Sequence, residues 1–246
     1  MYVPVASLPR LSHLPVTLRP QPTPKTALCT FKPAAPIDGN TAQWGMLPYH
    51  IGTHGRFAAR TMGFAGVGQG NRQRSLQRNS SRFAVGYNAQ GLLLAVWVST
   101  PEPMHNDANH WWIWRGDCVR LYIATLRRNP WMDQNHFQIG LAPVTDGHGP
   151  PEAVNLGMRT ASGVGMGGLI PGAKVAAQQG HNGWSLEAMV PWSYFGRQPH
   201  PGAGWGFDLQ AGGHTWNGGG DDWSNPTRWG VLRFAPMDTD LKHTGR

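Results

Sequence analysis

Short apolar segments, each bounded by Gly, Pro or Asn, recur along most of this chain and limit it to an all-β fold. The clearest pair, residues 83–87 and 92–98, flanks Asn88-Ala89-Gln90-Gly91, which is the pattern of two strands joined by a tight hairpin. Further strands are predicted at residues 118–124, 136–141, 174–179, 184–190, 206–211 and 229–234. No amphipathic helices alternate with these segments, and only residues 192–195 are expected to form a helical turn. The sequence therefore predicts an antiparallel two-sheet β-sandwich of the jelly-roll or immunoglobulin-like kind.

The 246 residues are sufficient for one such domain with extensions. Eight prolines in residues 1–36 fix φ and remove backbone donors, so this segment is predicted to be an extended arm. The domain proper is expected at residues 37–235, with residues 236–246 as a C-terminal tail. Residues 52–81 and 158–169 combine Gly with polar residues without periodicity, and both are predicted to be largely loops.

Positive charge is concentrated in the first third of the chain. Residues 1–82 contain ten Lys or Arg and a single acidic residue, Asp38, whereas the formal charge of the whole chain is +8. The arginines expected to dock a partner are Arg56, Arg60, Arg72, Arg74, Arg78 and Arg82. Such a region favours an anionic membrane surface or an acidic protein face, with solubility alone as the plain alternative. Phe57 and Phe64 are the only aromatic residues between Arg56 and Arg82, which is sparse for a platform that stacks bases, so nucleic acid is a disfavoured partner.

The two cysteines, Cys29 and Cys118, fit no zinc or redox spacing. One long-range disulfide and two separate thiols both stay open, and the apolar strand around Cys118 favours two thiols. No stretch approaches the roughly 18 apolar residues of a membrane span, and no secretory signal is recognisable in residues 1–36.

Ten of the twelve tryptophans divide by their sequence surroundings. Those inside predicted strand-like segments are expected to pack in the core: Trp44, Trp97, Trp184, Trp192 and Trp229. Those beside Gly and polar residues are candidate exposed recognition groups: Trp111, Trp112, Trp114, Trp216 and Trp223.

The acidic residues and histidines give no catalytic pattern. A glycosidase needs two carboxyl groups at a controlled separation, but the only glutamates are Glu102, Glu152 and Glu187, and their positions suggest no pairing. The histidines are scattered without metal-ligand spacing. We therefore expect a binding protein rather than an enzyme.

Several segments, in the right order, resemble the family 9 carbohydrate-binding modules, which are β-sandwiches. The segments are Ile37-Asp38-Gly39 with Trp44, the hairpin of residues 87–98, the stretch from Trp114 to Ile123, the stretch from Gly183 to Trp192, and residues 206–210 followed by Trp216 and Trp229 to Leu232. The resemblance covers about residues 37–235. It implies a non-catalytic module that recognises glycans, in a periplasmic or secreted protein.

In that family two tryptophans sandwich a sugar ring, and by position these correspond to Trp114 and Trp216, with Trp111, Trp112 and Trp223 widening the platform. Arg120 and Gln138 stand where the family has a sugar-contacting glutamate and arginine. Together with Asn217 they are the expected partners of sugar hydroxyls. No cofactor is expected, although a Ca²⁺ ion is bound in some relatives.

Two alternatives stay open. In the first, the sugar site has decayed and the domain is an accessory or structural subunit, docked through its basic N-terminal third on a larger complex, including a membrane-associated one. In the second, the chain resembles haem-binding domains of the DOMON type, with Met104, Met158 or Met166 and a histidine as candidate ligands. The sequence has no C-x-x-C-H motif, so haem is the less expected cofactor.

Overall fold

The computed structural model describes residues 23–52, 80–126, 131–158, 161–218 and 223–236. Strands dominate it, and the helical elements are all short. In chain order the elements are β1 (Thr26–Phe31), η1 (Thr41–Trp44), β2 (Tyr49–Ile51), β3 (Ser81–Tyr87), β4 (Gly91–Ser99), η2 (His110–Arg115), β5 (Val119–Ala124), β6 (His136–Ala142), β7 (Glu152–Asn155), β8 (Lys174–Gly180), β9 (Gly183–Pro191), α2 (Trp192–Phe195), β10 (Gly204–Ala211), β11 (His214–Thr215), η3 (Pro226–Arg228) and β12 (Gly230–Phe234).

The predicted hairpin is present, with β3 and β4 pairing from Ser81 opposite Val98 to Tyr87 opposite Leu92. Its turn is closed by the side chain of Asn88, whose Oδ1 accepts the backbone N–H groups of Gln90 and Gly91. The other predicted strands and the turn at α2 also form.

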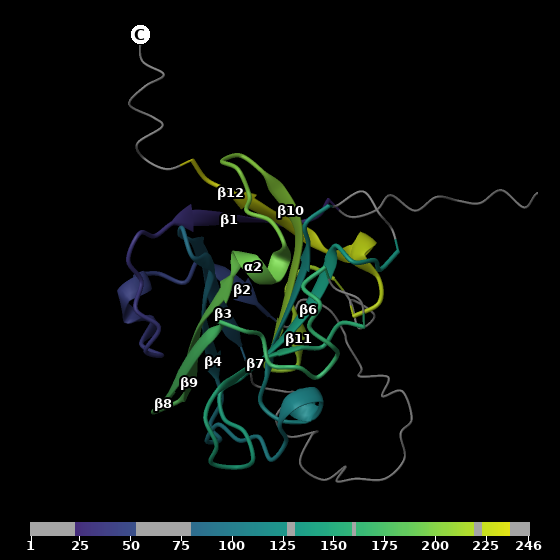
Figure 1. The fold of residues 1–246 in the computed structure, drawn as a ribbon. Helices are drawn as coiled ribbons and strands as arrows, with labels where there is room; N and C mark the ends of the chain where they lie inside the picture. The colour runs from purple at the N-terminus through teal and green to yellow at the C-terminus, as the bar shows by residue number, and fades with distance from the viewer. Residues whose placement is uncertain (1–22, 53–79, 127–130, 159–160, 219–222, 237–246) are drawn as a thin grey trace, which may run out of the picture.

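The strands hydrogen-bond in one order, β7-β6-β5-β10-β12-β1-β3-β4-β9-β8, with β11 on β10 and β2 on β3. We call β7-β6-β5-β10-β12 the first half and β3-β4-β9-β8 the second half; they lie on opposite sides of the molecule in Figure 1. The all-β prediction is confirmed. The prediction of a purely antiparallel two-sheet sandwich is not, because the strands form a nearly closed, barrel-like mixed sheet.

Strand β1 is the reason for this difference. Its residues 26–29 pair in parallel with β12, and Thr30 and Phe31 pair in parallel with β3, so one strand joins both halves. Ala27 and Cys29 point into the interior and are fully buried, while the residues between them are exposed. These residues belong to the segment predicted as an extended arm, and they form part of the sheet itself. Because β1 pairs with both β12 and β3, neither of these strands is left as a free sheet edge.

The main core lies between the halves and is rich in aromatic side chains, including Phe83, Phe207, Trp205 and Phe234. Cys29 lies in this core and Cys118 is partly buried beside η2, and both thiols are free. Burial raises the pKa of Cys118 to about 11. None of the helices in the described ranges has the length and apolar character that crossing a membrane requires.

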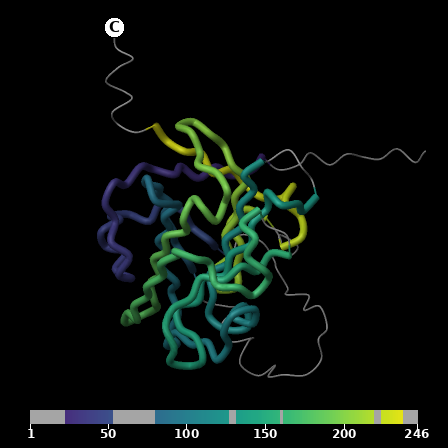
Figure 2. Tube along the Cα trace, viewed as in Figure 1, coloured from purple at the N-terminus to yellow at the C-terminus, as the bar shows by residue number. Residues whose placement is uncertain are grey.

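A second packing layer covers part of the outer face of the second half. The chain of residues 37–47, coloured purple in Figure 2, crosses this face, and Trp44 packs on Ala84, Leu93 and Ala95. Glu187 on β9 holds it there. The carboxyl group of Glu187 accepts four hydrogen bonds, from the backbone N–H of Asp38 (3.1 Å) and Gly39 (2.9 Å), from Gln43 Nε2 (2.7 Å) and from Trp44 Nε1 (2.7 Å).

Candidate functional site

The predicted polar partners share the outer face of the first half. Arg120 on β5 lies opposite Gly140 of β6 and Gln210 of β10. Two residues further along, Tyr122 lies opposite Gln138 and Asp208. Opposite residues in an antiparallel pair point to the same side, as do residues i and i+2 on a strand. Arg120 and Gln138 therefore project from the same face.

The short helix η2 forms one border of this face. Its Ile113 is fully buried and fits over Gly140, where an added Cβ would lie 2.7 Å from Ile113 Cδ1. The buried side chain of Asn106 fixes the helix, because its Nδ2 donates to the carbonyl oxygens of Ile113 (2.8 Å) and Asp117 (3.0 Å). The helix is thus attached beside Arg120 by packing on a glycine and by a saturated amide.

The tryptophans of η2 differ in how much of each ring is available. Trp111 is partly buried and packs against Ile113 and its neighbours. Trp112 is 46% exposed, and its ring centroid lies 6.0 Å from that of Trp114, which is partly buried. The guanidinium carbon of Arg115 lies 3.9 Å from the centroid of Trp112. The guanidinium of Arg115 therefore lies over one face of the Trp112 indole, and Trp112 stays about half exposed.

Residues 216–218 and 223–225 border the face on the other side. Asp208, fully buried on β10, anchors this segment by accepting the backbone N–H groups of Asn217 (3.0 Å) and Gly218 (2.7 Å). Burial raises the pKa of Asp208 to about 6, against the lowering effect of these backbone donors. Gln138 Nε2 donates to the carbonyl oxygen of Trp223, whose side chain is 45% exposed. Trp223 is thereby positioned next to Gln138.

The predicted clamp of Trp114 and Trp216 is not formed, because Trp216 is only 4% exposed and lies in the core. The reason is the register of the β10–β11 hairpin. Gly212 and Gly213 both have positive φ and reverse the chain, so the N–H of Trp216 donates to the carbonyl oxygen of Leu209 opposite it. Since Leu209 points inward, Trp216 does too, and it meets Phe83 and Phe207 with ring centroids 5.6 and 5.4 Å away.

Asn217, the third predicted polar partner, is engaged in holding the chain. Its Oδ1 accepts the backbone N–H of Lys25 (2.7 Å), and its Nδ2 donates to the carbonyl oxygen of Arg228 (2.6 Å). The side chain joins the start of β1 to the residues before β12. Its amide is therefore committed to the fold.

Of the predicted docking arginines, five lie outside the described residues: Arg56, Arg60, Arg72, Arg74 and Arg78. The remaining one, Arg82, is exposed on β3. It projects from the outer face of the second half, opposite Trp97 of β4. It is thus separate from the face that carries Arg120.

Two of the three glutamates hold the fold together. Glu187 is saturated by four donors, and Glu152 accepts the backbone N–H of His110 (3.2 Å). Within the described ranges, no cluster of three or more His, Cys, Asp or Glu side chains is placed to hold a metal ion. Met158 and Met166 are exposed and Met104 packs against the core, which lends no support to a haem site.

The sequence analysis misplaced one further tryptophan. Trp44, Trp184, Trp192 and Trp229 are buried as predicted, but Trp97 is only partly buried and lies on the outer face of β4. Its neighbours Leu93 and Ala95 on the same side are covered by residues 37–47, and this cover ends before Trp97. A strand that is apolar on both faces gives no local signal of where its cover stops.

These features define an all-β protein with a fold like that of the family 9 carbohydrate-binding modules. Two solved structures with this fold are of such a module from Caldicellulosiruptor kristjanssonii, one in complex with glucose and one with cellotriose. Both are 14% identical to this chain and cover 87% of it, with TM-scores of 0.56 and 0.57 and coverage of 98% and 96% of the module. No family model and no curated protein matches the chain.

Proposed function

We propose that this protein is a non-catalytic glycan-binding module whose site is the outer face of the first half. The observation that carries the proposal is the flanking of Arg120 and Gln138 by two half-exposed indoles, Trp112 from η2 and Trp223 from the residues before η3. Indole faces suit the apolar CH faces of sugar rings, and adjacent polar side chains suit the hydroxyl groups. The carbohydrate-binding-module fold of the chain adds support.

In this proposal the stacking residues are Trp112, Trp114 and Trp223, and Trp216 contributes only to packing. Arg120 replaces an acceptor by a five-donor guanidinium, which favours ligand oxygens that accept hydrogen bonds. We propose an extracytoplasmic location with it, on the strength of the resemblance alone.

The test is titration of the purified chain with glucose and cellotriose, followed by isothermal titration calorimetry. Loss of one stacked indole is expected to weaken binding about tenfold in Trp112→Ala and in Trp223→Ala. Trp131→Ala is the control for loss of an exposed indole, because Trp131 is 77% exposed and is not among the residues proposed to contact the sugar. Unchanged affinity in both site variants would contradict this location of the site.

The accessory-subunit alternative rests on the concentration of positive charge in residues 1–82. Its expected signature is absence of glycan binding by the native chain together with co-purification in a larger assembly. An Arg-to-Ser series in residues 56–78 would then release the partner, because an attraction between oppositely charged surfaces needs those charges.

A further inference from the structure

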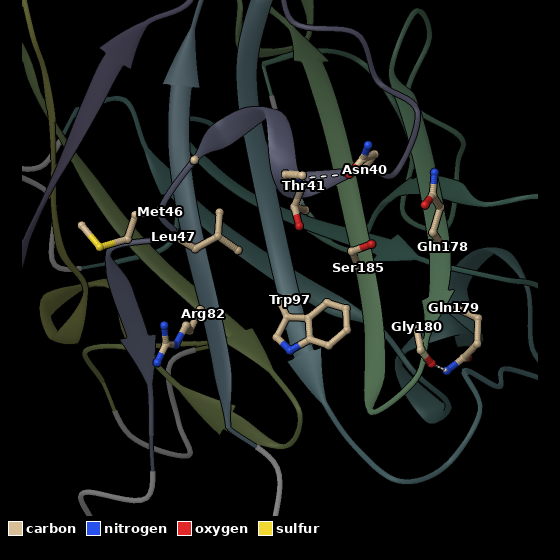
Figure 3. A pocket seen from close by; sticks show the side chains of 12 residues that line it. Asn40, Thr41, Met46, Leu47, Arg82, Trp97, Gln178, Gln179, Gly180 and Ser185 are labelled. Carbon is tan, nitrogen blue, oxygen red and sulfur yellow. Dashed lines mark hydrogen bonds between the residues drawn. The ribbon is translucent and has the colours of Figure 1, made fainter.

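A groove lies on the outer face of the second half, on the opposite side of the molecule from the site proposed above. One row of side chains crosses its four strands, because Arg82 lies opposite Trp97, Trp97 opposite Ser185, and Ser185 opposite Gln178. Figure 3 shows these side chains projecting from β3, β4, β9 and β8 toward the same space. They form the floor of the groove.

The wall of the groove is the segment from Asn40 to Leu47, which is held by Glu187 one row further along the sheet. Ser185 Oγ reinforces this wall by donating to the carbonyl oxygen of Gly39 (2.6 Å). The groove is open to solvent, and its volume is about 430 Å³. This is within the range of pockets that hold small ligands.

Trp97 is seated on backbone rather than on side chains. Gly180 and Gly183, at the ends of the β8–β9 turn, lie so close that an added Cβ would come within 2.7 and 3.0 Å of the six-membered ring of the indole. Two glycines thus let the indole lie close to the end of the hairpin. Within the described residues the indole N–H makes no hydrogen bond, although the ring lines the groove. The Trp97 indole thus offers a ligand both an aromatic surface and a hydrogen-bond donor.

Polar groups around the indole also retain hydrogen-bonding capacity. Gln178 uses its Nε2 to donate to the carbonyl oxygen of Asp38 (3.0 Å), which leaves its Oε1 as an acceptor. Asn40 uses its Oδ1 to cap η1, which leaves its Nδ2 as a donor. The hydroxyl of Thr41 lines the same space. An aromatic surface surrounded by mixed donors and acceptors matches a polyhydroxylated ring.

The charge of the groove further limits the class of ligand that it can bind. Among the residues that the structure describes, Arg82 is the sole charged residue lining the groove, and none of the lining residues is acidic. A cleft lined by one sign of charge attracts a ligand of the opposite sign, and a guanidinium binds a carboxylate with two parallel hydrogen bonds. Trp97 and Arg82 lie directly opposite each other on neighbouring strands, with Cβ atoms about 5 Å apart, so one ligand can contact both side chains.

We propose that this groove is a second carbohydrate site that binds an acidic saccharide, stacking one sugar ring on Trp97 and pairing the carboxylate of that saccharide with Arg82. The inference extends the glycan-binding function to a separate face and a different class of sugar. The two sites are on opposite halves, so each can be tested while the other is intact.

The test is calorimetric titration of the full chain with trigalacturonic acid and with cellotriose. Trigalacturonic acid is expected to bind, and Trp97→Ala to weaken it about tenfold while Trp97→Phe, which keeps a ring, weakens it less. Arg82→Gln is expected to remove a preference of about tenfold for the acidic over the neutral sugar. Trp131→Ala is again the control, and the thermal midpoint of each variant verifies folding.

Each outcome separates this inference from the function proposed for the first half. Binding of trigalacturonic acid that is lost in Trp97→Ala but kept in Trp112→Ala supports the groove, whatever happens to cellotriose. Equal affinities of the native chain and a folded Trp97→Ala variant would overturn it, even if Trp112→Ala abolishes cellotriose binding. No binding of trigalacturonic acid by the native chain would also overturn it.

Discussion

Replacing Glu187 by Ala tests how the segment of residues 37–47 is held on the sheet. The variant deprives four donors of their acceptor, and two of them, the N–H of Gly39 and Nε1 of Trp44, are buried. Each buried donor left without a partner costs about 1–3 kcal/mol. With smaller contributions from the backbone N–H of Asp38 and from Gln43 Nε2, which are only partly buried, the expected loss is about 4 kcal/mol in the free energy of unfolding.

For a domain of this size, about 4 kcal/mol corresponds to a decrease of about 10 °C in the thermal midpoint. Differential scanning calorimetry measures it. Glu187→Gln retains one acceptor oxygen and the shape of the side chain, so about half of the loss is expected. Glu102→Gln is the matched control, because Glu102 is exposed and its substitution should stay within about 0.5 kcal/mol.

Hydrogen exchange of the Gly39 amide locates the effect. In Glu187→Ala this amide should lose its protection first, before strands β4 and β9 open, because its acceptor is missing. A midpoint equal to that of Glu102→Gln, with the Gly39 amide still protected, would refute the reasoning. The segment would then be held by the packing of Trp44 alone.

Three further predictions follow from other buried groups. Burial raises the pKa of Asp208 in the folded state from 3.8 to about 6. The stabilisation of the fold by this carboxyl group is therefore fully present below pH of about 4 and is lost, by about 3 kcal/mol in total, as the pH rises to about 6. Denaturant titrations across this window should show less pH dependence for Asp208→Asn than for the native chain. Trp216→Ala should cost about 3–5 kcal/mol of stability, whereas Trp112→Ala should cost less than about 0.5 kcal/mol, and equal midpoints would show that Trp216 is not a core residue. Gly91→Ala places a Cβ 2.3 Å from the carbonyl oxygen of Val190 and should lower the free energy of unfolding, measured by urea denaturation, by about 3 kcal/mol. Gly52→Ala, with open space around it, should leave this free energy unchanged.

The strands were predictable from the sequence because each is a local pattern. The turn residues between residues 83–87 and 92–98 predict a hairpin. Pro191 marks where β9 ends and α2 begins. The two parallel pairs of β1 were not predictable, since its six residues carry no signal for which strands lie on either side. Parallel pairing between distant segments is a property of the closed sheet, not of the strand.

The inward direction of the Trp216 side chain could have been predicted from the sequence. Gly212-Gly213 is a two-residue turn of the kind that closes hairpins, and counting outward from it places Trp216 opposite Leu209. The partial exposure of Trp97 could not have been predicted from the sequence. Its exposure depends on where a segment about 50 residues earlier in the chain stops covering β4, and only the three-dimensional contacts define that.

The residues that carry the family resemblance are mostly those that build the fold. Gly39 and Trp44 of the opening motif are the partners of Glu187 in the later motif, so two segments nearly 150 residues apart are one hydrogen-bonded unit. Trp192 and Trp229, which lie in the motifs, are buried. Such positions are constrained by packing whatever the ligand is. A chain can therefore keep the whole pattern while Arg120 and Gln138 change the polar surface, which is why the motifs predicted the fold better than they predicted the site.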